Sequence, residues 1–266
     1  MLGAILGDYI GSVYERFNIK SEDFPLFRDD CRFTDDTVLT VAVADVLMNN
    51  KDYATTIKEY SRKYPLAGYG GNFINWVDSD NMQGYNSWGN GSAMRVSSVG
   101  WLFNSMEEVM SEAKRSAEVT HNHPNGIKGA QAIACCIFWA RTSLFSMEPL
   151  AKDDIKRKIE KHFEYDLNRT IDEIRPTYEF DVSCEGSVPE AIIAFLESKD
   201  IESCIRKAIS IGGDSDTIAA MAGGIAEAFY GTGKIPHTMS THLFKALEKE
   251  EPLIKIVNQF YEKIKK

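Results

Sequence analysis

Ile211-Gly212-Gly213-Asp214-Ser215-Asp216-Thr217-Ile218 joins two glycines and a polar cluster directly to a segment with helical periodicity. After this stretch, apolar residues recur at three- and four-residue spacing, at Ile218, Met221, Ala222, Ile225 and Phe229. That spacing is typical of a helix with one buried face. It recurs in residues 38–47 and 127–137, whereas few segments alternate apolar and polar residues over the length of a strand. The sequence therefore predicts an all-α fold.

The interruptions of this helical pattern are short. They fall at Pro25 and in residues 65–71, 84–91, 124–126, 176–186 and 231–236. None has the composition of a domain linker, and the sequence contains neither a fixed-period repeat nor a low-complexity tract. A chain of 266 residues lies at the upper edge of what one hydrophobic core serves. We therefore expect a single domain over residues 1–266, with amphipathic surface helices at residues 153–161 and 254–266.

The charge balance limits the partners of the protein. Acidic residues outnumber basic ones by 39 to 30, which gives a formal net charge of -9. This charge argues against a general affinity for nucleic acid or anionic lipid. The longest apolar stretches, such as residues 130–140, are too short to cross a bilayer, and no positively charged targeting segment opens the chain. We expect a monomeric cytoplasmic protein without nucleic-acid or membrane partners.

The cysteines do not suggest a metal or redox site. There are five, an odd number, and they follow neither zinc-ligand nor Cys-x-x-Cys spacing; they are Cys31, Cys135, Cys136, Cys184 and Cys204. The adjacent pair within the apolar run cannot easily close a disulfide with itself. We expect reduced core residues.

Two acidic clusters stand directly before helical segments. The first, Thr34-Asp35-Asp36-Thr37, precedes the apolar pattern that begins at Val38. The second is the Asp214-Ser215-Asp216-Thr217 cluster, whose two preceding glycines permit a positive φ or a close approach. Each cluster, taken alone, has the composition of a helix N-cap, because a threonine or aspartate there accepts a backbone N–H and an acidic first turn suits the helix dipole.

Capping explains only part of these clusters. A cap uses one carboxylate, whereas each cluster offers two carboxylates and a threonine hydroxyl. Oxygen ligands without histidine or cysteine favour magnesium, calcium or manganese over zinc, and two clusters supply enough carboxylates for two ions. This hypothesis requires the two clusters to meet in space, which their spacing in the sequence does not show.

Glycine-rich and histidine-containing segments give weaker signals. Residues 68–72 and 88–95 are loops that could bring backbone N–H groups against phosphate, the second of them leading into a helix, and Arg95 is alternatively a structural ion-pair residue. His121 and His123 stand in a turn before a buried helix, where a metal, base, capping or packing role fits.

The opening segment, residues 3–14, is predicted to be a helix that ends at Glu15. Its three glycines lower helix stability by roughly 1 kcal/mol each relative to alanine. We therefore expect them to be retained by close contact with another helix or a ligand.

Taken together, these segments resemble the ADP-ribosylglycohydrolase family. The matching motifs are Gly3-Ala4-Ile5-Leu6-Gly7-Asp8 with Ser12-Val13-Tyr14-Glu15, Phe33-Thr34-Asp35-Asp36-Thr37, Gly89-Asn90-Gly91-Ser92-Ala93-Met94-Arg95, Thr120-His121, and Gly212-Gly213-Asp214-Ser215-Asp216-Thr217 with Ala222-Gly223. They occur in order and span nearly the whole chain. The resemblance implies a compact orthogonal bundle of helices.

The resemblance also implies a set of site residues. A centre of two Mg²⁺ ions, or Mn²⁺, would be held by the residues that match the family's ligands: Thr34, Asp35, Asp36, Asp214, Asp216 and Thr217. The residues that would bind the substrate are Glu15, Gly89, Asn90, Gly91, Ser92, Met94 and His121. Glu15 matches a glutamate of the family branch that includes the serine-linked ADP-ribose hydrolase of animals, where it approaches the metal site and moves with substrate. The interval of 19 positions from Glu15 to Thr34 is short for that branch.

The activity that the resemblance implies is magnesium-dependent hydrolysis of the bond between ADP-ribose and an arginine or serine side chain of a protein. Asp35, Asp36 or Glu15 would activate a water for attack at the anomeric carbon, and the departing group would leave an oxocarbenium-like state. The alternatives are a hydrolase of a small ADP-ribose conjugate or a nucleotide, and a relative that binds ADP-ribose without catalysis.

Overall fold

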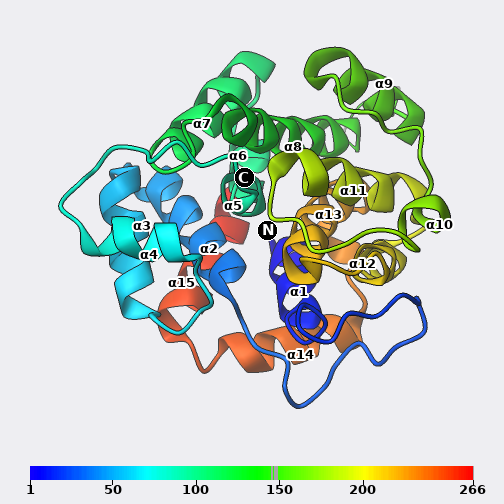
Figure 1. Ribbon diagram of the computed structural model, residues 1–266, viewed down its shortest axis with the longest axis horizontal. Helices are drawn as coiled ribbons and strands as arrows, with labels where there is room; N and C mark the ends of the chain where they lie inside the picture. Colours follow the sequence, from blue (N-terminus) through cyan, green and yellow to red (C-terminus); the bar gives the residue numbers. More distant parts are fainter. Residues whose placement is uncertain (145, 147–148, 266) are drawn as a thin grey trace.

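Helices α1, Leu2–Gly11, and α13, Ser215–Tyr230, form the central pair of the computed structural model, which describes residues 1–144, 146 and 149–265. The two helices lie side by side at the centre of the molecule (Figure 1). Both are buried along almost their whole length, and most residues of each are apolar or glycine.

Three glycines of α1 explain how closely this pair packs. A Cβ atom added to Gly3 would lie 2.1 Å from the carbonyl oxygen of Gly223, and one added to Gly7 would lie 2.0 Å from that of Ala219. At Gly11 the added atom would lie 2.5 Å from the Cα atom of Asp216. No side chain fits at these separations, so the backbones of α1 and α13 touch directly. The close helix contact expected for these glycines is therefore present.

The other helices surround this pair. In chain order they are α2 (Asp35–Asn49), α3 (Tyr53–Lys63), α4 (Gly71–Asp78), α5 (Gly91–Met94), α6 (Ser97–Leu102), α7 (Met106–Glu118), α8 (Pro124–Ser143), α9 (Lys152–Phe163), α10 (Ile171–Ile174), α11 (Cys184–Glu197), α12 (Ile201–Ser210), a 3₁₀ turn (Thr232–Lys234), α14 (His237–Leu247) and α15 (Glu251–Ile264). Helices α8, α11 and α12 pack against α13, and α2 packs against α3 and α15. Figure 1 shows α2, α3 and α4 on one side of the central pair and α10, α11 and α12 on the other.

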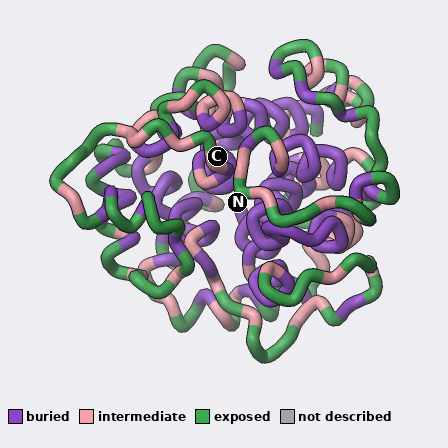
Figure 2. The backbone as a smooth tube through the Cα atoms, viewed as in Figure 1, coloured by how far each residue is buried: buried purple, intermediate pink, exposed green. Residues whose placement is uncertain are grey.

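The prediction of an all-α fold is confirmed. In the described part of the chain, the strand-like pairing is a single isolated bridge between Gly89 and Ser183. Buried positions concentrate on the central helices, whereas the outer helices and the connecting loops are mostly exposed (Figure 2). Among the described residues, no helix combines the length and apolar character needed to cross a membrane.

The two amphipathic surface helices are present with nearly the predicted bounds. Helix α9 buries Ile155, Ile159 and Phe163 on one face and exposes charged residues on the other. Helix α15 likewise buries every third or fourth residue, while Lys266 of the predicted segment lies outside the described residues. All five cysteines are free thiols, four of them buried and Cys31 partly buried, as expected for reduced core residues.

The predicted bounds of the opening helix are wrong at its C-terminal end. Helix α1 ends at Gly11, and residues 12–17 form turns rather than a further helical turn up to Glu15. The N–H groups of Tyr14 and Glu15 both point to the carbonyl oxygen of Gly11, at 2.8 and 3.2 Å. Beyond this turn, the side-chain amide of Asn18 donates to the carbonyl oxygens of Tyr14 and Glu15. Glu15 therefore lies on a loop.

Candidate active site

The two acidic clusters meet at the N-termini of α2 and α13. Thr34 is the N-cap of α2, and its hydroxyl accepts the N–H of Asp36 at 3.3 Å. Asp214 is the N-cap of α13 but makes no side-chain capping bond, so its carboxylate is free for another role. The hydroxyl of Thr217 donates to Asp36 at 3.1 Å, across 181 positions of sequence. The contact that the cation hypothesis required is therefore present.

The two glycines before Asp214 both adopt the left-handed conformation that favours glycine. Gly212 has a φ of 78° and Gly213 a φ of 68°. They turn the chain sharply between α12 and α13, so that Asp214 and Asp216 face α2 rather than solvent. The positive φ expected from the sequence is thus present at both positions.

Asp8 of α1 organises the start of α2, a role that the sequence did not reveal. Its carboxylate is fully buried and accepts hydrogen bonds from the N–H groups and the hydroxyls of Thr34 and Thr37. Burial raises the pKa of Asp8, and these four bonds oppose that rise. The available signal was a lone carboxylate inside the glycine-containing, otherwise apolar opening helix. Asp8 thereby fixes the first turn of α2 against α1.

Buried carboxylates gather on both sides of Asp216. Oxygen atoms of Asp8, Asp36 and Asp216 lie within 4.8 Å of one another, and oxygens of Glu15, Asp214 and Asp216 form a second such group. Asp36 is buried, and its Oδ1 atom has no hydrogen-bond partner. A buried anionic oxygen without a partner is costly unless a cation or proton neutralises it. The residues present therefore fit a hard divalent cation, and the shared Asp216 suits a pair of them.

The electrostatics of the centre lead to the same conclusion. Burial, followed by the charge of Asp8, raises the pKa of Asp35 to about 8. Burial also raises the pKa of Asp214 to about 6, against a hydrogen bond from Asn90 that lowers it. The pKa values of Asp36 and Asp216 rise well above the usual range through burial and the neighbouring carboxylates. Without a cation, burial and the mutual repulsion of their ionised forms therefore favour the protonated side chains.

We expect the stability of the metal-free protein to fall as the pH rises from about 4 to 8. An unfolded aspartate has a pKa of about 3.9, whereas Asp35 and Asp214 titrate at about 8 and about 6 when folded. Over that interval the folded state holds more protons than the unfolded chain, so raising the pH destabilises it. A bound divalent cation takes the place of those protons. The increase in melting temperature on adding Mg²⁺ should therefore be larger at pH 8 than at pH 5.5.

Thermal melts with Mg²⁺ or EDTA at both pH values, at constant ionic strength, measure this difference. A matched concentration of charge as NaCl is the control for screening. An increase from Mg²⁺ that is equal at pH 5.5 and pH 8 would contradict the electrostatic account of the centre.

A cleft of about 530 Å³ opens above these carboxylates. Twelve of the thirteen predicted metal- and substrate-binding residues line it: Glu15, Thr34, Asp35, Asp36, Gly89, Asn90, Gly91, Met94, His121, Asp214, Asp216 and Thr217. Ser92 is the exception, because its buried hydroxyl donates to the carbonyl oxygen of Gly126 at 2.7 Å beneath the cleft wall. The sequence segments expected to form one site thus converge on one cavity.

Comparison with known proteins identifies this arrangement. The family profile described as ADP-ribosylglycohydrolase matches residues 1–266. The chain belongs to the ADP-ribosylglycohydrolase family. It is similar to ADP-ribosylhydrolase ARH3 of Gallus gallus, with 27% identity over 89% of this chain and 85% of the relative, and to the Homo sapiens protein of the same name, with 27% identity over 90% and 86%.

Further matches agree with this assignment. An uncharacterised protein of Archaeoglobus fulgidus is 33% identical over 52% of this chain and 48% of its own length. A solved structure titled ADP-ribosylglycohydrolase-related protein complex superposes with a TM-score of 0.70 at 22% identity, covering 98% of this chain and 95% of that one, and supports the fold. As an ADP-ribosylglycohydrolase, the protein is a glycosidase that acts on ADP-ribosylated substrates, and its acidic groups could hold a metal ion.

Asn90 connects the glycine-rich wall of this ADP-ribosylglycohydrolase to the acidic centre. Its side-chain amide donates to Asp214 at 2.7 Å, and its backbone N–H donates to the carbonyl oxygen of Val182 at 2.8 Å. The amide therefore sets the orientation of the Asp214 carboxylate. The helix that follows, α5, is only four residues long, so the helix end expected there to favour anions is a single turn.

His121 presents its Nε2 atom to the same wall. Arg95 donates to the hydroxyl of Thr120 at 2.8 Å, and that hydroxyl lies 2.7 Å from Nδ1 of His121. A hydroxyl that accepts from Arg95 still has its own proton to give to Nδ1, and in that arrangement the imidazole carries its proton on Nε2. Burial, and then the charge of Arg95, lower the pKa of His121 well below its usual value. The Nε2 atom of this imidazole faces Gly91, where an added Cβ would lie 3.0 Å from it.

The ion pair considered for Arg95 is absent among the described residues. Its guanidinium is fully buried, donates to the carbonyl oxygen of Ser116 and to Thr120, and has its pKa lowered to about 10 by burial. Of the two histidines, His123 has the capping role: its Nδ1 accepts the N–H of Asn125 at the start of α8.

The remaining wall of the cleft is glycine-rich and aromatic. Gly70 and Gly71 leave open space where a Cβ would stand, and Gly68 has a φ of 108°. The indole of Trp88 and the ring of Phe180 line the cleft and are each about half exposed. Flat aromatic surfaces at the rim, with small residues behind them, suit the base of a nucleotide.

Proposed function

We propose that this ADP-ribosylglycohydrolase releases ADP-ribose from an arginine or serine side chain of a protein, and that it depends on two Mg²⁺ ions, for which Mn²⁺ can substitute. The observation that carries the proposal is the pair of carboxylate groups sharing Asp216, all buried except Glu15, together with the unpartnered Oδ1 atom of Asp36. Carboxylate and hydroxyl oxygens without nitrogen or sulfur ligands favour Mg²⁺ over zinc.

The residues that would hold the two ions are Thr34, Asp35, Asp36, Asp214, Asp216 and Thr217, all of which line the cleft. When bound, such ions supply positive charge that orients ribose hydroxyls and lowers the pKa of water. Asp8 and Asn90 would act through these ligands, since Asp8 fixes Thr34 and Asn90 fixes Asp214. Partners of this kind typically change metal affinity or activity by about 10- to 100-fold when they are removed.

The chain itself supplies the acid–base chemistry. Asp35, Asp36 and Glu15 are the candidates for the group that takes a proton from the attacking water at the anomeric carbon. Glu15 on its loop and Asp35 at the start of α2 are partly exposed, whereas Asp36 is buried. As the bond to the leaving group breaks, its electron pair goes to the serine oxygen or arginine nitrogen, which takes up a proton equivalent to the one lost by the water. The surrounding carboxylates would stabilise the positive charge of the oxocarbenium-like state.

The glycine-rich wall would bind the rest of the substrate. Backbone groups near Gly89 and Gly91 and the Nε2 proton of His121 would face the diphosphate, with Met94 against the adjoining ribose. Trp88 and Phe180 would stack on the adenine at the cleft rim. This arrangement puts the anomeric carbon and its leaving group at the end of the cleft where Glu15 and Asp35 stand.

We expect ADP-ribose to appear when the protein is incubated with ADP-ribosylated peptide in Mg²⁺, and to be absent with chelator. Parallel reactions with arginine-linked peptides, serine-linked peptides and small ADP-ribose conjugates, followed by chromatography of the nucleotide products, identify the bond cleaved. Release that continues in chelator would contradict the metal dependence. If only small conjugates are turned over, the substrate is a small ADP-ribose conjugate and not a modified protein. If the substrates bind but none is cleaved, the proposal of a hydrolase is wrong.

A further inference from the structure

The side chain of Asn18 joins the loop that carries Glu15 to the loop that carries Asp214. The Nδ2 atom of Asn18 lies 2.8 Å from the carbonyl oxygen of Glu15 and 2.9 Å from that of Tyr14. The same atom lies 3.2 Å from the carbonyl oxygen of Gly213, and Oδ1 of Asn18 accepts the N–H of Gly213. One amide therefore connects the backbone of Glu15 to the residue that precedes Asp214.

Further contacts hold the residues that follow Asn18 in the same loop. The ammonium group of Lys20 donates to the carbonyl oxygens of Ile211 and Tyr178, each at 2.6 Å. Arg206 of α12 donates to the backbone oxygens of Glu22 and Phe24, at 3.1 and 2.8 Å. These bonds attach the loop to Arg206 in α12 and to Ile211, the residue before the two glycines Gly212 and Gly213.

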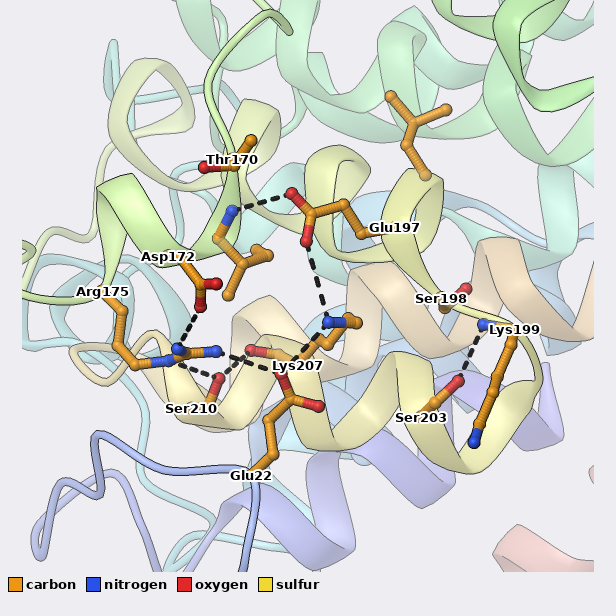
Figure 3. A network of polar contacts seen from close by, with 12 residues as sticks. Glu22, Thr170, Asp172, Arg175, Glu197, Ser198, Lys199, Ser203, Lys207 and Ser210 are labelled. Atoms are coloured by element: carbon orange, nitrogen blue, oxygen red, sulfur yellow. Dashed lines mark hydrogen bonds and ion pairs between the residues drawn. The ribbon is translucent and has the colours of Figure 1, made fainter.

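An ion-pair network completes this attachment. The carboxylate of Glu22 lies 3.1 Å from Arg175 and 3.1 Å from Lys207 (Figure 3). Lys207 also approaches Glu197, and Arg175 also pairs with Asp172, so the loop is joined to α10, α11 and α12 together. A single exposed ion pair contributes little to stability, but a network that joins several elements restrains the segment between them.

We propose that Asn18 is a positioning residue that holds Glu15 against the Asp214–Asp216 side of the carboxylate centre. The inference rests on the proposed function, because it assigns to Glu15 a place in the metal site. Glu15 belongs to the carboxylate group of Asp214 and Asp216, whose oxygens lie within 4.8 Å of one another. Glu15 lies on a loop rather than in a helix. Asn18 bonds both to the backbone of Glu15 and to Gly213, the residue before Asp214.

Asn18 acts without touching the substrate. It is absent from the residues that line the cleft, and its side chain is exposed, so replacing it removes no core packing. The consequence of losing it is freedom of the Glu15 loop, with Lys20 and Glu22 still holding the segment further along. The expected effect is therefore weaker binding of the metal ion nearest Glu15, with the fold retained.

The test is a double-mutant cycle of Asn18→Ala and Glu15→Gln. Mn²⁺ affinity, measured from free Mn²⁺ by electron paramagnetic resonance, should fall about tenfold for Asn18→Ala, the change that about 1.4 kcal/mol produces. Glu15→Gln should lower it by at least as much. The double variant should then match Glu15→Gln alone, because Asn18 acts through Glu15. Asn258→Ala, an exposed asparagine on α15, is the matched control and should leave the affinity unchanged.

Two results would overturn the role of Asn18: an unchanged Mn²⁺ affinity in Asn18→Ala, or a full additional loss when that change is made on top of Glu15→Gln. Steady-state kinetics of the same four variants give a second readout, a lower kcat with little change in KM. A wild-type protein that binds Mn²⁺ yet releases no ADP-ribose would contradict the proposed function alone. In that case the Mn²⁺ affinities of the four variants still decide the role of Asn18. Wild-type protein that binds no Mn²⁺ overturns both proposals.

Discussion

Asp36→Asn is expected to lower kcat/KM for release of ADP-ribose by a hundredfold or more, a loss of about 2.7 kcal/mol of transition-state stabilisation. The substitution preserves the shape of the side chain and removes the charge of an oxygen that has no partner in the protein. It also removes a carboxylate whose pKa is raised by burial and by Asp8 and Asp216. Without divalent cations at pH 8, the variant should therefore melt at a higher temperature than the wild type.

The two opposite effects distinguish loss of a site from loss of the fold. Thermal melts with and without Mg²⁺ should show a large stabilisation by the ion in the wild type and little in the variant. Asp45→Asn is the control, because Asp45 is a buried carboxylate on the same helix that bonds to Lys51, Asn49 and Tyr60 instead. It should melt at a lower temperature and keep its response to Mg²⁺. An Asp36→Asn enzyme with wild-type turnover would remove Asp36 from the centre.

The all-α fold and the family could be recognised from the sequence because both depend on patterns that are local in the chain. Apolar spacing indicates which residues form buried helices, and the excess of carboxylates at two helix starts indicates a cation. Contact between the two starts could not be inferred in the same way. Asp8 of α1 holds the start of α2, and α1 packs directly on α13 at Gly7 and Ala219. The two helix starts therefore meet through α1, by contacts between residues far apart in the sequence.

Other features of the site were missed for a related reason. Asp8 looked like one acid in an apolar helix, and its partners Thr34 and Thr37 stand 26 and 29 positions away. Asn18 looked like a polar loop residue, although it bonds to Gly213 over 195 positions. The end of α1 was misplaced because the residues after Gly11 form turns, and the polar contacts of that segment reach Gly213. Roles that depend on such distant polar contacts are not encoded in spacing.

Gly7→Ala is expected to destabilise the protein by about 3 kcal/mol or more, above the typical cost of overpacking a core. The added methyl group would stand 2.0 Å from the carbonyl oxygen of Ala219 and 2.3 Å from its carbonyl carbon, and backbone atoms cannot rotate away as a flexible side chain would. The gain of roughly 1 kcal/mol from replacing glycine within a helix is too small to offset this clash. Helices α1 and α13 must therefore separate.

That separation should weaken the carboxylate centre as well, since α1 carries Asp8 and α13 carries Asp216. Chemical denaturation measures the loss of stability, and Mg²⁺-dependent melts measure the damage to the centre. The matched control is Gly224→Ala, also a glycine inside this helix pair, where an added Cβ would meet its nearest neighbours at an ordinary 3.5 Å. That variant should be as stable as the wild type or slightly more so, because alanine is the better helix former. If Gly7→Ala unfolds at the same denaturant concentration as Gly224→Ala, the direct backbone contact between α1 and α13 does not govern the stability of this fold.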